Sequence, residues 1–339
     1  MCIIAYLTLN KQTYLAKNRD RYYITPIKIV RERINGVEIL YLIDLKTGWI
    51  EGINEFGIAI VNSVLPTEAE ETFTRYVGKN SMESQVRTVN KKHGGSQLQR
   101  LHDKLEINTG GKSNRRKGNH DGKIILQALS QRRIEDALSI LVSCNCYTNY
   151  GIMSKLTTGL NGHTIISNGS YTFSVENTSK TRPVVREISK RCVRTNTPVY
   201  ISTKKGGYNP VTNKLGYISS RRRYQQAKGF VKGITKPDQI LPKLATINYD
   251  DPCNSPYRIG HRCDNDYLYG FATTSQILFK INSKQMVLHT DQYNTDYMGF
   301  IDRIGDDAKT KLMVQEFIRP EYKPTTLQSR RPDHKLLNV

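Results

Sequence analysis

The sequence predicts an α+β protein built as a four-layer αββα sandwich, in which two antiparallel sheets are flanked by helices. Strand-like runs fill residues 1–65 and return at 163–202, and a late hairpin is expected at 271–288. Between the strand-rich parts, residues 124–129 and 134–141 carry apolar residues at helical spacing. A further helix is expected from Ser220 to about Val231. Because helical segments separate groups of strands, each sheet can carry a helical layer on its outer face.

The first hairpin brings charged residues close to the start of the chain. Residues 2–9 and 13–16 are apolar and β-prone, and a short polar segment separates them. Two such runs joined by a turn form a hairpin, so the second strand returns toward the beginning of the first. We therefore expect the segment Lys17-Asn18-Arg19-Asp20 to lie near Cys2.

Turn signals predict the next strands. Asn54–Gly57 supplies turn residues and precedes the apolar run Ile58–Val61, which is typical of a buried strand. Asn168–Gly169 separates two strand-like runs within residues 163–177, and Asn-Gly is the strongest short hairpin signal.

Helix starts are predicted from capping residues. Asp121 is expected to cap the first helix of the middle pair. Ser219 or Ser220 is expected to cap the later helix, because Ser side chains satisfy the free N–H groups at a helix start.

The chain is expected to form one domain over residues 1–317, with a basic Gly-rich insertion at about 86–121 and an extended basic tail at 318–339. The insertion is polar and is typical of a long loop. Gly111-Lys112-Ser113 lies within it, but the Gly that a phosphate-binding loop needs five residues earlier is Glu106. A phosphate-binding loop is therefore excluded.

Composition excludes several classes of protein. The 339 residues can bury a sizeable core and include no apolar stretch long enough to span a membrane. The apolar start lacks a basic leader and a cleavage site, so a cytoplasmic location is expected. The six cysteines form no CxxC pair and the seven histidines show no metal-like pairing, so no metal, disulfide framework or cofactor is expected. Cys144 and Cys146 are interpreted as buried thiols.

Cys2 stands directly behind Met1, and removal of Met1 would leave a thiol and an α-amine on one residue. In model peptides the thiol titrates near ~8.5 and the amine near ~7.7 to 8.0, so the amine can accept the thiol proton near neutral pH. This pair predicts a nucleophile that carries its own base.

The order of motifs resembles the choloylglycine hydrolase and penicillin acyltransferase branch of the N-terminal nucleophile (Ntn) hydrolases. That family opens with a Cys strand followed by an Arg-Asn-x-Asp segment, for which this chain has Lys17-Asn18-Arg19-Asp20. The later matches are a Gly-x-Asn-Glu-x-Gly turn with a strand ending in Asn, a strand-end Thr-Asn motif, and a Ser-Ser-x-x-Arg-aromatic motif at a helix start. They stand at Gly52–Asn62, Thr195–Asn196 and Ser219–Tyr224.

The resemblance implies the Ntn-hydrolase fold and a cysteine amidohydrolase that cleaves non-peptide linear amide C–N bonds in a small acyl-amide substrate. Cys2 would form a thioester, which water or another acceptor resolves, so acyl transfer stays open beside hydrolysis. By position, Asp20 would accept a hydrogen bond from the Cys2 amine. Lys17 stands where the family usually has Arg and would lower the thiol pKa. Because Lys lacks the planar fork, Arg19 could take over that role.

Three further positions follow from the same resemblance. Asn196 is the candidate oxyanion donor, and Asn62 is a second candidate. Arg223 would complete the polar cluster through charge-assisted hydrogen bonds.

The charge balance supports an alternative. A net charge of +21 and a pI of about 9.7 attract polyanions through counterion release. The alternative hypothesis is therefore a nucleic-acid- or polyanion-binding protein on an Ntn-hydrolase scaffold with lost or altered activity. A glutamine amidotransferase, which also begins Met-Cys, is disfavoured because Ile3-Ile4 replaces the Gly that usually follows the cysteine.

Overall fold

The computed structural model describes most of the sandwich and leaves several segments undescribed. The described residues are 2–21, 27–44, 48–65, 120–143, 160, 162–178, 181–201, 214–246, 254–258, 272–290, 298–303 and 313–316. The predicted insertion up to residue 119, the predicted tail and the pair Cys144 and Cys146 lie outside them.

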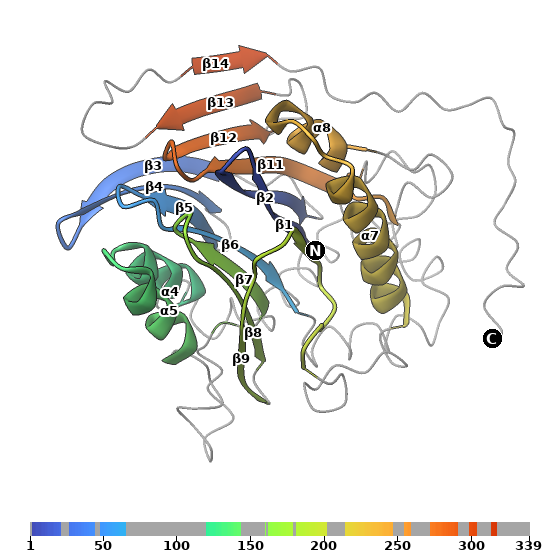
Figure 1. Ribbon diagram of the computed structural model, residues 1–339, viewed down its shortest axis with the longest axis horizontal. Coiled ribbons are helices and arrows are strands. Elements are labelled where there is room, and N and C mark those ends of the chain that lie inside the picture. Colours follow the sequence, from blue (N-terminus) through green and yellow to red (C-terminus); the bar gives the residue numbers. More distant parts are fainter. Residues whose placement is uncertain are drawn as a thin grey trace, which may run out of the picture.

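Two seven-stranded antiparallel sheets form the centre of the molecule (Figure 1). The first sheet has the order β10-β1-β2-β11-β12-β13-β14, and the second runs β3-β4-β5-β6-β7-β8-β9. The strands of the first sheet are β1 (Cys2–Leu9), β2 (Gln12–Arg21), β10 (Cys192–Arg194), β11 (Ala272–Lys280), β12 (Gln285–Thr290), β13 (Met298–Arg303) and β14 (Met313–Glu316).

The second sheet follows the chain order. Its strands are β3 (Ile27–Ile34), β4 (Val37–Asp44), β5 (Ile50–Asn54), β6 (Ala59–Val64), β7 (Gly162–Ser167), β8 (Thr172–Thr178) and β9 (Thr181–Glu187). The predicted hairpins at 163–177 and 271–288 are confirmed as β7–β8 and β11–β12. β13 and β14, which extend the first sheet, were not predicted.

The helices cover the outer faces of the two sheets (Figure 1). α4 (His120–Leu129) and α5 (Ile134–Ser143), which include the helical pair predicted at 124–129 and 134–141, lie on the second sheet. α7 (Lys214–Lys232), the 3-10 turn η2 (Pro237–Gln239) and α8 (Ile240–Leu244) lie on the first.

Two predicted caps are wrong. α4 begins at His120, so Asp121 lies inside the helix. α7 begins at Lys214, five residues before Ser219, so Ser219 and Ser220 lie within its body. Neither serine can therefore serve the free N–H groups of the first turn.

Three apolar clusters, one at each interface between neighbouring layers, confirm the predicted four-layer αββα sandwich. The cluster between the sheets includes Ile4 and Leu15 from the first sheet and Leu40 and Val61 from the second. A second cluster joins the first sheet to α7 and α8, and a third joins the second sheet to α4 and α5. The alternation of side chains along each strand supplies both faces of each sheet.

Close backbone contact sets α4 against the second sheet. A Cβ atom at Gly122 would lie 1.9 Å from the Gly48 carbonyl oxygen, and one at Gly52 on β5 would lie 2.8 Å from Leu129 Cδ1 on α4. Only glycine fits these two positions without displacing its neighbours.

The turn between β1 and β2 consists of Asn10 and Lys11, both in the left-handed region with φ of 51° and 63°. Two consecutive residues with positive φ are typical of the type I′ turn, whose twist matches that of the strands it joins. This turn sets the pairing of β1 with β2, in which Cys2 lies opposite Arg19 and Ile4 opposite Lys17.

Candidate active site

Alternation along β2 sends its charged segment in two directions. Leu15 contributes to the cluster between the sheets, whereas Ala16 contributes to the cluster under α7 and α8. Because side chains alternate along a strand, Lys17 and Arg19 point between the sheets and Asn18 and Asp20 point toward the helices. All four side chains are buried.

The nitrogen of Cys2 is held by Asn196. Cys2 N donates a hydrogen bond of 2.8 Å to Asn196 Oδ1. In the chain with Met1 attached this nitrogen is a peptide nitrogen, and it would become the α-amine after Met1 is removed. Asn196 Nδ2 donates to Ser63 Oγ at 3.3 Å and to the Val64 carbonyl oxygen. These bonds to β6 fix the amide with its oxygen toward Cys2.

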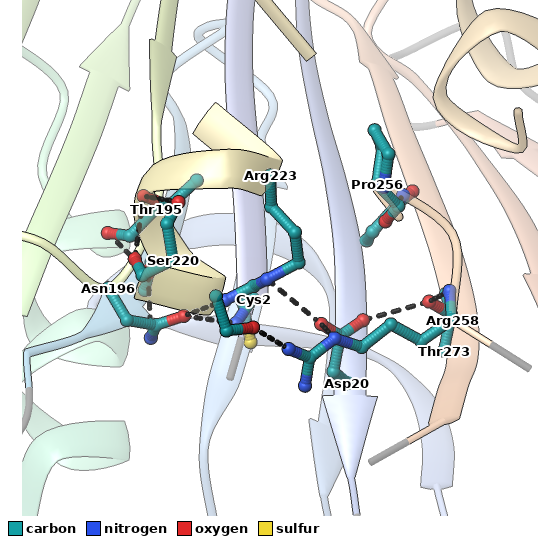
Figure 2. Close-up of polar contacts among 12 residues, drawn as sticks. Cys2, Asp20, Thr195, Asn196, Ser220, Arg223, Pro256, Arg258 and Thr273 are labelled. Atoms are coloured by element: carbon teal, nitrogen blue, oxygen red, sulfur yellow. Dashed lines mark hydrogen bonds and ion pairs between the residues drawn. The ribbon is translucent and has the colours of Figure 1, made fainter. Parts of the chain in front are cut away.

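Arg223 connects Asn196 to Asp20, as Figure 2 shows. Its Nη2 donates to Asn196 Oδ1 at 3.2 Å, and its Nη1 donates to Asp20 Oδ2 at 3.1 Å. Asp20 Oδ1 accepts a further hydrogen bond of 2.8 Å from Thr273 Oγ1 on β11. The structure therefore joins Cys2, Asn196, Arg223 and Asp20 in one buried chain of hydrogen bonds.

Burial and the nearby Arg258 lower the pKa of Arg223 from its ordinary value to about 9. Asp20 and Cys2 act in the opposite direction, because negative charge on either residue favours the protonated guanidinium. Arg223 is therefore still charged at neutral pH, as its buried ion pair with Asp20 requires.

Arg258 is a site residue that the sequence did not reveal. Its Nε lies 3.9 Å from Asp20 Oδ2 (Figure 2). Its guanidinium donates a hydrogen bond to Ser219 Oγ on α7. Its backbone N–H donates to Thr273 Oγ1 at 2.9 Å. Arg258 is fully buried and comes from the short described segment 254–258. A lone arginine outside a regular element gives no pattern from which its position could be predicted.

The two serines of the Ser-Ser-x-x-Arg motif fasten α7 to the site. Ser220 Oγ donates to Thr195 Oγ1 at 2.9 Å, and Thr195 Oγ1 donates to the Ser220 carbonyl oxygen at 3.2 Å. Ser219 receives the hydrogen bond from Arg258. Their role in the structure is to position α7 beside the Thr195–Asn196 segment.

A buried ion network fills the space between the sheets next to Cys2. Lys17 Nζ pairs with Glu51 on β5 and donates to Asn62 Oδ1 at 3.2 Å. Arg19 pairs with Asp44 at 3.0 Å and also with Glu51. Each of the four charged side chains is at most 1% exposed, so the two carboxylates offset cations that would otherwise be costly to bury. Neither carboxylate was predicted as a site residue.

Lys17 and Arg19, the two candidates for the positive group near the thiol, both belong to this network. Arg19 lies directly opposite Cys2 in the β1–β2 pairing, and Lys17 lies two residues further along the same face. Arg19 makes two contacts with carboxylates, in keeping with its planar fork. Asn62 Nδ2 donates to the Ile50 carbonyl oxygen at 3.1 Å while its oxygen accepts from Lys17.

A second buried pair shapes the segment that follows Asn196. The Glu176 carboxylate accepts hydrogen bonds from the backbone N–H groups of Val199, Tyr200 and Ile201 at 2.9–3.3 Å. His163 Nε2 donates to the Thr197 carbonyl oxygen at 2.8 Å, and burial lowers the His163 pKa despite the nearby carboxylate. This turn of chain is therefore held from β7 and β8.

Within the described ranges, no group of three or more His, Cys, Asp or Glu side chains could hold a metal ion. Neither Cys2 nor Cys192 forms a disulfide there. Burial raises the pKa of Cys192, which makes it a useful internal comparison for Cys2. No helix in the described part of the chain is both long and apolar enough to cross a membrane.

Comparison with known proteins finds similarity only at the level of structure. No family model and no curated protein matches the sequence. The structure is similar to penicillin V acylase from Agrobacterium tumefaciens, with a TM-score of 0.45 and 11% identity over 90% of this chain and 86% of that one. It is also similar to a mutant of conjugated bile acid hydrolase from Clostridium perfringens, with a TM-score of 0.47 and 11% identity over 96% and 98% of the two chains. A second variant of the same hydrolase gives a TM-score of 0.47 and 11% identity over 94% and 98%.

Proposed function

We propose that this protein is a cysteine N-terminal nucleophile amidohydrolase, which cleaves a non-peptide linear amide C–N bond in a small acyl-amide substrate. The observation that carries the proposal is the contact between the Cys2 nitrogen and Asn196, whose oxygen also binds Arg223. A nitrogen anchored in this way can act as a base beside the thiol of the same residue once Met1 is removed.

The first half of the reaction forms a thioester. The free amine of Cys2 takes the thiol proton, and the thiolate attacks the carbonyl carbon of the substrate amide. The resulting ammonium then protonates the leaving nitrogen as the C–N bond breaks. The hydrogen bond to Asn196 fixes how the amine is oriented during both proton transfers.

The second half releases the acyl group. The amine takes a proton from water as the water oxygen attacks the thioester carbonyl. The C–S bond then breaks, the acyl group leaves as a carboxylic acid, and the ammonium returns its proton to the Cys2 sulfur. An acceptor amine or alcohol in place of water would give acyl transfer by the same steps. Either reaction needs a reduced Cys2, which suits the cytoplasmic location expected from the sequence.

The remaining site residues act on charge and position. We assign Asp20 to hold Arg223, and Arg223 to hold Asn196 and favour the thiolate. Lys17 and Arg19 supply positive charge from the opposite side, between the sheets.

An oxyanion role for Asn196 requires one of its N–H groups to leave Ser63 or Val64 when substrate binds. Asn62 Nδ2 donates to the Ile50 carbonyl oxygen, so the N–H group in that bond would also have to leave it before it could bind an oxyanion. We therefore propose positioning of the amine as the main role of Asn196.

The test is intact-protein mass spectrometry before and after brief exposure to a thiol-reactive acylating probe. We expect loss of Met1 and a single fast adduct on Cys2, absent in Cys2→Ala. Cys192→Ala is the matched control, because it removes the other described thiol and leaves the adduct in place. Retained Met1, or a Cys2 that reacts no faster than Cys192, would exclude this mechanism.

A second candidate function is binding of nucleic acid or another polyanion on the same scaffold, with the amidase activity altered or lost. The net charge of +21 favours it. Binding that collapses with added salt in a protein whose Cys2 is unreactive would support this candidate over the first.

A further inference from the structure

We infer that the outer face of α7 is a docking surface for the phosphate backbone of a nucleic acid. α7 presents Arg221, Arg222, Gln225, Lys228 and Lys232 to solvent. These positions follow a spacing of three or four residues along most of the helix, so they form one stripe. The inference does not depend on the chemistry of Cys2.

The charge on this helix is of one sign. Residues 214–232 include six lysines and arginines and no aspartate or glutamate. Of these, Arg223 is buried on the inner side, where it serves the Cys2 site. The apolar residues Ala227 and Val231 face the first sheet, so the helix is anchored by one side and charged on the other.

Neighbouring segments extend the stripe. Arg191 is exposed, and its Nη1 donates to the carbonyl oxygens of Val231 and Lys232 at the end of α7. Lys236 follows the helix and is also exposed. We call the six solvent-facing cations together the α7 basic face; they are Arg191, Arg221, Arg222, Lys228, Lys232 and Lys236. Asp238 is the single acidic residue in residues 214–246.

The helical layer on the opposite side is different. On α5 and just before it, Arg133 lies 3.5 Å from Glu135 and 3.9 Å from Asp136. The first turn of α5 thus supplies acidic neighbours for Arg133, whereas α7 includes no acidic residue. Of the two described helical layers, the one with α7 therefore attracts a polyanion more strongly.

Dimensions and composition favour nucleic acid over a lipid surface. Arg221 and Lys232 are eleven residues apart, or about 16 Å along a helix, which equals roughly five base-pair steps along a duplex axis at about 3.4 Å each. Membrane-surface helices insert large apolar side chains. Among the described residues the exposed large apolar side chains are Phe56, Tyr171 and Val199, and none of these is on α7.

Tyr224 adds a group suited to bases. Its ring is partly buried on α7, and the Lys228 ammonium lies 5.9 Å from the ring centre. An aromatic ring beside cations provides a surface on which an unpaired base can stack without sequence preference. We therefore expect binding with little dependence on base sequence.

The test measures binding of the full chain to a fluorescein-labelled 20-base-pair DNA duplex by anisotropy between 50 and 200 mM NaCl. The variant Arg221→Gln/Lys228→Gln/Lys232→Gln removes three charges from the α7 basic face. The control Lys28→Gln/Arg132→Gln/Arg133→Gln removes three exposed charges from the other side of the sandwich. Melting temperatures of all three proteins establish that each is folded.

For the α7 variant we expect at least tenfold weaker binding at 50 mM NaCl. The slope of log Kobs against log salt should fall in magnitude by about 2–3, since each phosphate contact contributes about 0.9. The control should keep the wild-type slope. Equal losses in both variants, or an unchanged slope in the α7 variant, would overturn the inference.

Two measurements on the unmodified chain give an independent check. Bound duplex should protect Lys228 and Lys232 from acetylation and leave Lys28 reactive. The reverse pattern would contradict the inference. Binding to phosphatidylserine vesicles without binding to the duplex would also overturn it, in favour of a lipid surface.

Discussion

Glu51→Gln should strongly destabilise the fold, because Glu51 accepts hydrogen bonds from both Lys17 and Arg19 in the space between the sheets. Removing one partner of a buried ion pair costs about 3–5 kcal/mol. Glu51 has two cationic partners, so we expect a loss near 5 kcal/mol. A loss of this size equals the whole free energy of unfolding of the least stable domains, which is about 5 kcal/mol.

The assay is urea unfolding at pH 7 followed by circular dichroism. Glu135→Gln is the matched control, because Glu135 is exposed and pairs with an exposed arginine, Arg133, at 3.5 Å. Surface pairs of this kind contribute at most about 1 kcal/mol. If Glu51→Gln costs no more than Glu135→Gln, the buried network does not hold the sheets as described.

A double variant keeps the test informative if Glu51→Gln does not fold. Lys17→Met combined with Glu51→Gln removes one charge of each sign and leaves Arg19 paired with Asp44 at 3.0 Å. We expect the double variant to be more stable than Glu51→Gln alone, because no cation is left without its carboxylate. If the double variant loses as much stability as Lys17→Met and Glu51→Gln lose together, the coupling between Lys17 and Glu51 is refuted.

Three other predictions concern the amine anchor, acid stability and two glycines. Asn196→Ala should slow acylation of Cys2 at least tenfold, since a hydrogen bond to a charged group contributes about 1.5–3 kcal/mol; stopped-flow rates that match those of the Asn62→Ala variant would contradict this. Burial lowers the pKa of His289 from 6.5 to about 4. As the pH falls from about 6.5 to about 4, His289 therefore takes up a proton in the unfolded chain but not in the folded one, and the free energy of unfolding declines. His289→Gln should flatten that decline in urea midpoints, and an unchanged pH profile would oppose it. Gly122→Ala should lower the free energy of unfolding by about 1–3 kcal/mol through overpacking. At Gly229 a Cβ meets nothing within 4 Å, so Gly229→Ala should stabilise α7 by about 0.5–1 kcal/mol. Thermal melts in which Gly122→Ala is the more stable of the two variants would contradict the packing.

Local signals in the sequence were sufficient for much of the fold. The hairpin at Asn168–Gly169 was predicted because Asn-Gly is a strong hairpin signal. The observed loop spans residues 168–171, in which Gly169 has a φ of 91° and Asn168 does not have a positive φ. The pair of helices α4 and α5 followed from apolar spacing. The start of α7 was predicted too late because serine is a preferred helix cap. In the structure the Ser220 hydroxyl binds Thr195 and the Ser219 hydroxyl binds Arg258 instead.

The site was predicted less completely, because its contacts join distant parts of the chain. The segment Lys17–Asp20 could be placed near Cys2 from the hairpin alone. Glu51 and Asp44 could not, since their partners lie 25 to 34 residues away on another sheet. A glutamate inside the apolar run Trp49–Ile53 was the available signal, because a charged residue in a buried strand needs a buried partner.

The short turn at Asn10 and Lys11 has a consequence for sequence change far from Cys2. The turn lies at the opposite end of β1, about 25 Å from Cys2 at ~3.4 Å per residue. One extra residue in the turn that moved β2 by one position would turn Lys17 and Arg19 toward α7 and Asp20 toward the second sheet. An insertion at this exposed loop would therefore reverse the charges on both faces of β2. Loop length here is as much a determinant of the site as the identity of the residues in it.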